Sequence, residues 1–197
     1  MMARCIELAR ACGRTPDLPI SAIVCDGPEV LAEATNQVSH ARDVSRHAEI
    51  VALSQASRGR GRLDFTGCTL YSLVEPCAMC SFALRESRIA RVVFALNSPL
   101  LGGWSKWSIL DDAGLGATLG GFYGTVPELR SGVLAEEAEA AFRDWNPLVW
   151  SVMKRRGLFA IGEPHEEAPT FLHTLGECLT SPGAFFGWVR HATRVRK

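Results

Sequence analysis

Residues 68–96, CTLYSLVEPCAMCSFALRESRIARVVFAL, hold the pattern that decides the fold. The first seven residues predict a buried strand, and Glu75-Pro76 ends it. Pro76 suits the start of a helix, because its missing N–H is not needed there. The helix is predicted over residues 77–87 and a second strand over 91–96. A strand, a helix and a strand in about 30 residues predict a right-handed parallel crossover.

The segment upstream predicts an antiparallel addition to this unit. Residues 20–25 and 30–35 have the pattern of two strands, and the turn at 26–28 joins them as a hairpin. A helix is predicted from near residue 46 to about residue 57, where a glycine-rich stretch ends it, and a short amphipathic helix within residues 1–13. Together these elements predict an α/β layered domain.

The downstream half is less regular. Residues 97–124 form a glycine-rich loop that contains Trp104 and Trp107, and loops of this length are often functional. Two helices are predicted after it, one around Phe142 and one from Asn146 to Gly157. We expect a linker over residues 162–169 and a further helix and a basic cluster in the tail. The predicted organisation is one domain over residues 1–157 and a C-terminal extension over 158–197, packed on that domain or separate from it.

The overall composition favours some classes of protein over others. Lys plus Arg and Asp plus Glu number 21 each, so there is no global positive field and a nucleic-acid partner is less favoured, although a local basic patch remains open. The seven cysteines are odd in number and irregularly spaced, which favours a reducing compartment. No apolar stretch approaches the roughly 20 residues of a membrane span. We therefore expect a soluble cytoplasmic protein with no membrane partner.

Two short motifs predict a metal site. They are His47-Ala48-Glu49 and Pro76-Cys77-Ala78-Met79-Cys80. Cys77 and Cys80 lie three apart at a helix start, so their sulfurs share one side of the first turn, and the helix N-terminus favours thiolates. His47 completes the ligand set if the N-termini of the two helices converge. Three such ligands bind Zn²⁺ with a fourth position open, which is typical of catalytic zinc.

Glu49 is the candidate proton carrier. Two residues beyond His47, its carboxylate could take a proton from water at the open position and pass it to a substrate. This H-x-E and P-C-x-x-C signature is the one found in zinc deaminases. The alternative is a structural zinc site, which a fourth Cys or His closes and in which Glu49 is a solvated helix residue.

Beyond these motifs, the chain resembles the cytidine deaminase superfamily, and especially the branch of guanine deaminase, cytosine deaminase and tRNA adenosine deaminase. The similarity covers about residues 18–96, and its most specific parts are residues 34–38, 73–80 and 87–94. It implies a three-layer α/β/α sandwich around a five-stranded mixed sheet, usually assembled as a homodimer. It also implies that Asn36 contacts the substrate and that backbone groups around Ala48 and Glu75 line the pocket; for Asn36 the alternative is a turn residue.

The chain departs from this branch at several positions. Ser21 stands where glycine is common, Arg46 where a small residue precedes the histidine, and Phe82 where a small residue follows the second cysteine. The lysine and glycine-alanine pattern of tRNA adenosine deaminases is not seen in residues 97–106. Trp104 and Trp107 could stack on a flat base or could pack the loop or a dimer contact.

The sequence thus predicts a zinc-dependent hydrolytic deaminase that acts on the exocyclic amine of a small heterocycle. A free nucleobase, a nucleoside or a related amino-heterocycle is the favoured substrate, with a guanine-like ring preferred. The alternative within the family is a tRNA adenosine deaminase. A non-catalytic zinc-bearing scaffold is the alternative from another class.

Overall fold

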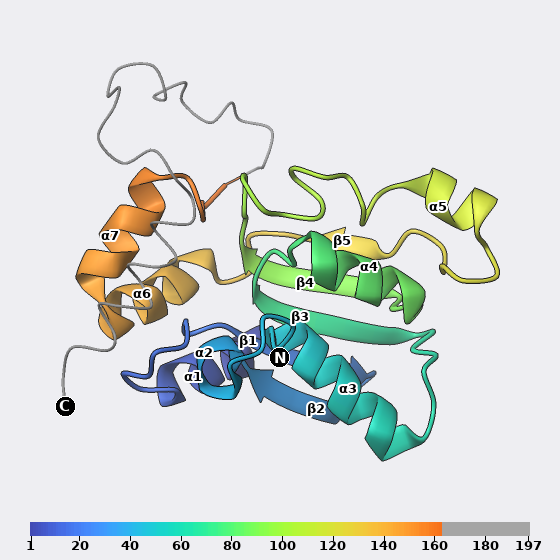
Figure 1. Cartoon of the computed structure of the whole chain (residues 1–197), viewed down its shortest axis with the longest axis horizontal. Coiled ribbons are helices and arrows are strands. Elements are labelled where there is room, and N and C mark those ends of the chain that lie inside the picture. The colour runs from blue at the N-terminus through green and yellow to red at the C-terminus, as the bar shows by residue number, and fades with distance from the viewer. Residues whose placement is uncertain (163–197) are drawn as a thin grey trace.

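The computed structural model describes residues 1–162, and these contain one five-stranded sheet (Figure 1). The strand order is β2-β1-β3-β4-β5. The strands are β1 (Ser21–Asp26), β2 (Glu29–Thr35), β3 (Cys68–Val74), β4 (Arg91–Leu96) and β5 (Glu128–Arg130). β1 pairs antiparallel with both β2 and β3, whereas β3, β4 and β5 run parallel. The predicted hairpin and the predicted parallel crossover are therefore both confirmed.

Helices cover the two faces of this sheet. α1 (Met2–Ala11), α6 (Ala135–Trp145) and α7 (Pro147–Arg155) pack in one hydrophobic core with one face. α3 (Ala48–Arg60) and α4 (Ala78–Glu86) pack against the other face and lie in front of the strands in Figure 1. The two remaining helices, α2 (Val38–Ala41) and α5 (Ala113–Thr118), are short. The predicted three-layer α/β/α arrangement is confirmed.

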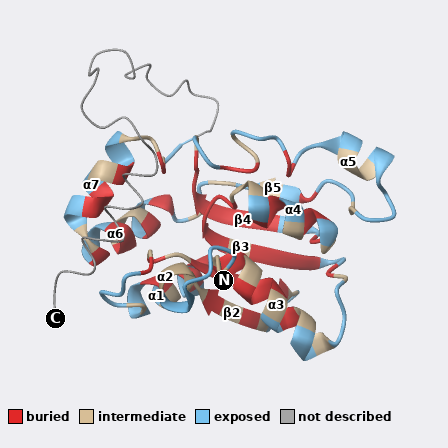
Figure 2. Cartoon of the chain, viewed as in Figure 1, coloured by how far each residue is buried: buried red, intermediate tan, exposed pale blue. Residues whose placement is uncertain are grey.

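The alternating direction of side chains along the strands produces the two cores. In β1, Ile23 and Cys25 belong to the core under α1, whereas Ala22 and Val24 belong to the core under α3. Successive side chains of a strand point to opposite faces, so a strand buried on both sides reads as a continuous apolar run. The inner strands β1, β3 and β4 are accordingly buried between the helix layers, as the red ribbons of β3 and β4 show in Figure 2.

The boundaries of the elements differ from the sequence prediction mainly at helix starts. β3 and β4 have the predicted bounds. α3 begins at Ala48 and α4 at Ala78, so His47 and Cys77 are N-cap residues with extended backbone instead of first-turn residues. The sequence pattern did not single out β5, because this strand has only three residues and two of them are exposed.

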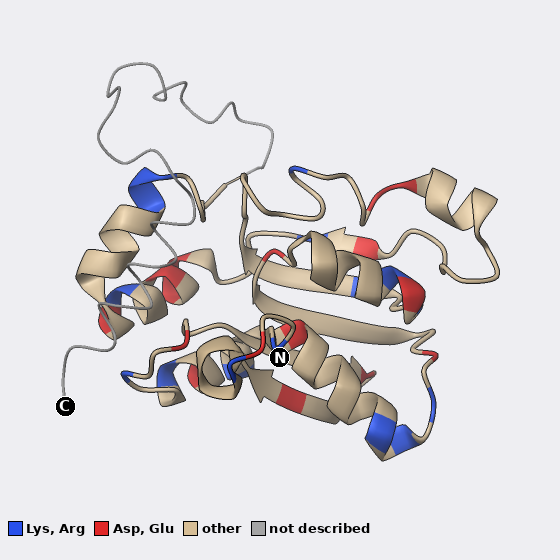
Figure 3. Cartoon of the chain, in the orientation of Figure 1, with Lys and Arg blue, Asp and Glu red and all other residues tan. Residues whose placement is uncertain are grey.

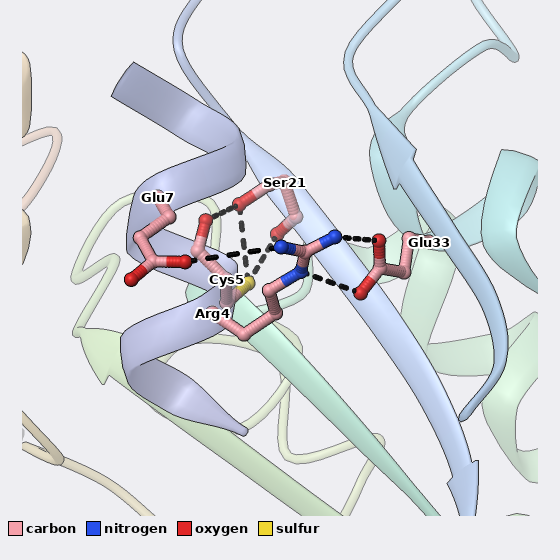
Figure 4. Close-up of polar contacts among 5 residues, drawn as sticks. All are labelled: Arg4, Cys5, Glu7, Ser21 and Glu33. Atoms are coloured by element: carbon pink, nitrogen blue, oxygen red, sulfur yellow. Dashed lines mark hydrogen bonds and ion pairs between the residues drawn. The ribbon is translucent and has the colours of Figure 1, made fainter. Parts of the chain in front are cut away.

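Hydrogen bonds and an ion pair join α1 to the sheet (Figure 4). The hydroxyl of Ser21 donates to the carbonyl of Cys5 at 2.6 Å, and the Cys5 sulfur lies 3.1 Å from the same hydroxyl. The guanidinium of Arg4 donates to both carboxylate oxygens of Glu33 in β2, at 2.9 and 3.0 Å. Ser21, which replaces the glycine common in the resembling branch, thus has a structural role between α1 and β1.

The described part of the C-terminal extension packs on the same domain. Leu158 and Phe159 are buried in the core with α6 and α7. Ala160 and Asn97 exchange two backbone hydrogen bonds of 2.9 Å, which join the extension to the end of β4. The predicted linker, tail helix and basic cluster lie almost wholly outside the described residues. Within residues 1–162, no helix has the length and apolar character needed to cross a membrane.

Candidate active site

Two helix N-termini converge at one end of the sheet. His47 is the N-cap of α3, Cys77 is the N-cap of α4, and Cys80 lies in the first turn of α4. Nδ1 of His47 lies 3.5 Å from the sulfur of Cys77 and 3.6 Å from that of Cys80, and the two sulfurs are 3.7 Å apart. The structure therefore brings the three predicted ligands together, from positions 30 residues apart in the chain.

These distances fit a tetrahedral zinc ion. With bonds of about 2.3 Å to sulfur and about 2.05 Å to nitrogen, tetrahedral angles place two sulfurs about 3.8 Å apart, and a sulfur and a nitrogen about 3.6 Å apart. The observed triangle has sides of 3.7, 3.5 and 3.6 Å. Among the described residues, these three side chains form the group of His, Cys, Asp or Glu whose ligand atoms lie close enough for a metal. The donor set and its geometry thus suit zinc with one position left for water.

The protonation of the three ligands is strongly coupled. Hydrogen bonding with Cys80 lowers the pKa of Cys77 to about 4, and contact with His47 adds to this effect against burial. The same pairing raises the pKa of Cys80 well above its usual value. The hydrogen bond with Cys77 also raises the pKa of His47. Zinc binding would replace the protons that the three groups share, because both thiolates and a neutral imidazole nitrogen are metal ligands.

Glu49 lies beside this group in the first turn of α3 and is only 3% exposed. One carboxylate oxygen is 3.6 Å from the Cys80 sulfur, and the other accepts a hydrogen bond of 3.2 Å from the hydroxyl of Ser72 in β3. Burial raises the pKa of Glu49. A carboxylate that is held in this way can take up and return a proton next to the metal position.

A cavity of about 210 Å³ opens onto the metal group. Its polar lining includes His47, Glu49, Cys77 and Asn36. The rest of the lining is mostly apolar and comes from five places: residues 16–20, the start of α2, the end of β3, the loop after β4, and the end of α7 with the residues after it. The apolar lining residues are Pro16, Leu18, Ile20, Val38, Val74, Leu101, Met153, Leu158 and Phe159. Such an apolar pocket with a few convergent polar groups is typical of a small-molecule site.

Most of the residues that form the apolar lining of the cavity were not predicted from the sequence. Met153, Leu158 and Phe159 belong to elements more than 70 residues after the zinc motif, and their spacing resembles that of ordinary core residues. The predicted boundary at residue 157 separates Met153 from Leu158, although both line one cavity. Only the packing of α7 beside the sheet brings them there.

Asn36 lies where the resemblance places a substrate contact. It lines the cavity, and its amide nitrogen is 3.4 Å from a carboxylate oxygen of Asp17. The same carboxylate accepts hydrogen bonds from the backbone N–H groups of Ser39 and His40, at 2.6 and 3.1 Å. Asp17 therefore joins Asn36 to α2, and the sequence pattern gave no signal for it. Whether Asn36 contacts substrate stays a prediction.

His47 and Glu49, which flank Ala48, line the cavity, and so does Glu75. Ala48 is fully buried in the core under α3 and is not among the cavity-lining residues. Glu75 lines the cavity, but its carboxylate accepts four hydrogen bonds from the segment 98–105. Both of its oxygens are thus used within the protein.

Neither tryptophan lines the cavity. Trp104 packs edge-to-face on Phe94, with ring centroids 5.9 Å apart, on the α3 side of the sheet. Trp107 is 56% exposed. Stacking of these rings on a substrate in this cavity is not supported, and Trp104 has the packing role that was the alternative.

The two bulky departures from the family pattern, Arg46 and Phe82, do not line the cavity either. Arg46 donates to the side-chain oxygen of Gln37 at 3.2 Å, and its carbonyl accepts from the Gln37 N–H. Phe82 is 42% exposed on α4 and contacts the ring of Tyr123. Arg46 therefore supports the segment around α2, and Phe82 belongs to the outer surface of α4.

Comparison with known proteins gives the family. A family model described as the cytidine and deoxycytidylate deaminase zinc-binding region matches residues 1–96. The chain is 34% identical over 139 residues to a tRNA-specific adenosine deaminase of Haemophilus influenzae. The aligned region covers 70% of this chain and 76% of that protein. It is 39% identical over 97 residues to a tRNA-specific adenosine deaminase of Aquifex aeolicus, covering 49% of this chain and 64% of that protein.

Other relatives match with different coverage. The chain is 32% identical over 144 residues to a tRNA(Ile)-lysidine synthase of Deinococcus deserti, and it spans 26% of the length of that protein. A solved structure from studies of A-to-I editing by tRNA:A34 deaminases has a TM-score of 0.63 at 26% identity, over 71% of this chain and 96% of that one. Guanine deaminase from Nitrosomonas europaea has a TM-score of 0.60 at 27% identity, over 74% and 82%. With its zinc-type site and its mixed five-stranded sheet, the chain belongs to the cytidine deaminase superfamily.

Proposed function

We propose that this protein is a zinc-dependent hydrolytic deaminase that converts an adenosine of a tRNA to inosine. The observation that carries the chemistry is the convergence of His47, Cys77 and Cys80 with Glu49 at the end of one cavity. Zinc held by these three ligands would supply a Lewis acid that activates water.

The protein's own groups then move protons and bind the ring. The Glu49 carboxylate takes a proton from the attacking water and later gives it to the departing amine. The carbon–oxygen bond forms, the carbon–nitrogen bond breaks, and one water is consumed for each ammonia released. The Ser72 hydroxyl orients the Glu49 carboxylate, and burial keeps bulk water from competing for the proton.

The names of relatives support RNA adenosine over the free base that the sequence pattern favoured. Two tRNA-specific adenosine deaminases and a solved tRNA:A34 deaminase are among the similar proteins. Exposed Arg14 and Arg42 also flank two of the segments that line the cavity, where they could meet phosphate. Along the described part of the chain, however, basic and acidic residues are interspersed (Figure 3).

Guanine is the second candidate substrate. Guanine deaminase of Nitrosomonas europaea resembles this chain about as closely as the tRNA:A34 deaminase structure does. The balanced charge of 21 basic and 21 acidic residues and the altered segment 97–106 also favour a small substrate. Both candidates are purines, and both require the same zinc and Glu49 chemistry.

A substrate panel tests the proposal. Zinc-loaded protein is incubated with an anticodon stem-loop that contains adenosine at the wobble position, and with free adenosine, guanine and cytosine. We expect inosine in the stem-loop and a rate that falls steeply with added salt, because phosphate contacts release counterions. Ammonia release from guanine alone would shift the assignment to the second candidate. No turnover of any substrate would favour the non-catalytic scaffold.

Glu49→Gln is the matched control for this panel. The variant should keep its zinc and its fold and lose at least about a hundredfold in turnover, since a general acid-base contributes about that much or more. Unchanged turnover would contradict the role of Glu49 and require another proton carrier.

We also propose that the protein is a cytoplasmic homodimer. The six described cysteines are free, which suits a reducing compartment. Met79 and Phe82 form an exposed apolar strip on α4, and Trp107 in the loop after β4 is exposed as well. A second copy would cover this strip.

A further inference from the structure

Glu75 has an unusual set of contacts for a residue next to a metal-binding loop. It is 2% exposed and stands between the end of β3 and Pro76. One carboxylate oxygen accepts from the backbone N–H groups of Trp104 and Ser105, at 3.0 and 2.7 Å. The other accepts from the Ser98 N–H at 2.7 Å and from the Ser105 hydroxyl at 2.8 Å. Four short hydrogen bonds to a buried carboxylate hold Glu75 and the segment 98–105 in fixed positions relative to each other.

The segment 98–105 in turn lies against the residues that carry the thiolates. The Gly103 N–H donates to the Pro76 carbonyl at 2.8 Å, and Gly102 forms an antiparallel bridge with Cys77. Neither glycine could carry a side chain, because a Cβ at Gly102 would overlap the Glu75 carboxylate and one at Gly103 would overlap Ser81. The backbone of the segment and the backbone of Cys77 are therefore in direct contact.

The same segment supports the far wall of the cavity. The Ser105 hydroxyl lies 3.1 Å from the carbonyl of Ser98, and the Ser98 hydroxyl donates to the carbonyl of Leu158 at 3.0 Å. Ser98, Leu101 and Leu158 all line the cavity. One carboxylate thus holds together a segment that contacts both the thiolate loop and the apolar wall.

We propose that Glu75 is a positioning residue, which sets the geometry of the Cys77 and Cys80 thiolates and the shape of the cavity through the segment 98–105. The carboxylate does not contact substrate. The inference depends on the metal site but not on which purine is the substrate, and its main readouts need no substrate.

The test uses Glu75→Gln and Glu75→Ala in the 197-residue chain loaded with Co²⁺, whose absorption reports the geometry of bound thiolates. Glu75→Gln is the milder change in size, but it sets an amide NH₂ among N–H donors. Glu75→Ala leaves three N–H groups and a hydroxyl without their acceptor. For both variants we expect altered cobalt–thiolate bands and at least about tenfold faster amide exchange within residues 98–105, because the exchange-protecting bonds are lost. On any substrate that is turned over, KM should rise more than kcat falls.

Two controls separate positioning from general stability. Ser105→Ala removes one of the four donors and should keep the native cobalt bands. Ile6→Ala, in the α1 core, should lower the free energy of unfolding while the bands and the exchange of residues 98–105 stay native. Native cobalt–thiolate bands and native amide exchange in Glu75→Gln would overturn the proposal. This result would decide the matter even if Glu75→Ala did not fold. Changed bands without any deamination would support positioning and count only against the proposed function.

Discussion

At the residue scale, the metal ligands combine local spacing with a long-range contact. Cys77 and Cys80 are adjacent because one helical turn separates them, whereas His47 reaches them only because α3 and α4 start at the same end of the sheet. This difference explains why the sequence could name all three ligands but could not give their distances.

Replacing one ligand tests this group. Cys80→Ala should bind far less than one zinc per chain and should unfold at a lower temperature, because metal affinity contributes to folding. Cys12→Ala is the matched control, since the Cys12 sulfur donates to the Leu8 carbonyl at 3.4 Å and lies outside the metal group. Zinc content is measured by elemental analysis. Full zinc occupancy in Cys80→Ala would mean that another residue is a ligand.

Residue identity alone did not separate site residues from supporting residues. Glu49 and Glu75 are both buried glutamates beside ligands, yet Glu49 faces the metal group and Glu75 faces the segment 98–105. The direction of each carboxylate depends on donors that lie 20 or more residues away in the chain. Their motifs are local, but their roles are set by tertiary contacts.

At the scale of elements, one ion pair joins α1 to β2. The Arg4 guanidinium lowers the pKa of Glu33 by hydrogen bonding in the folded state. A folded-state pKa below the unfolded value stabilises the protein above that unfolded value, and this stabilisation is lost as the pH falls through the folded pKa. Glu33→Gln should therefore be less stable than the parent at pH 7, and the difference should shrink toward pH 3.

Urea unfolding at the two pH values measures this difference. Arg4→Ala should show the same trend, because it removes the other partner of the same pair. A difference of equal size at both pH values would contradict the assignment of the effect to this ion pair.

A second element-scale contact organises the loop between β4 and β5. Arg85 of α4 is 1% exposed, and its guanidinium donates to the carbonyls of Ile109, Asp112 and Gly124, at 2.9, 2.9 and 3.2 Å. Burial lowers the pKa of Arg85, so the charge is held by these carbonyls in a poorly solvated place. The Arg85 side chain thus holds together the part of the loop from residue 109 to residue 124.

Arg85→Ala should cost at least about 2 kcal/mol of unfolding free energy, because several buried carbonyls lose a charged donor. Arg91→Ala is the control: Arg91 pairs with Glu128 on the surface, and such pairs contribute at most about 1 kcal/mol. Both values come from urea unfolding of the zinc-loaded protein. Equal losses would mean that the buried carbonyls find other donors.

At the scale of the whole molecule, the exposed strip on α4 predicts an assembly. Phe82→Lys should convert a dimer to a monomer, because a charge in an apolar interface loses solvation. Leu63→Lys is the matched control, since Leu63 is 78% exposed outside α4. Light scattering after size exclusion gives the mass of each variant. A monomeric parent protein, or a Phe82→Lys variant that stays dimeric, would contradict this interface.

The sequence by itself determined the sheet's antiparallel hairpin, its parallel crossover and the chemistry of the zinc motif. These depend on period-two and helical patterns, on turn residues and on spacing within one turn, all of which are local. Only the tertiary structure decided that Met153, Leu158 and Phe159 close the cavity, that β5 completes the sheet, and that Glu75 points to the segment 98–105. Those outcomes depend on contacts between segments far apart in the chain, which no local pattern records.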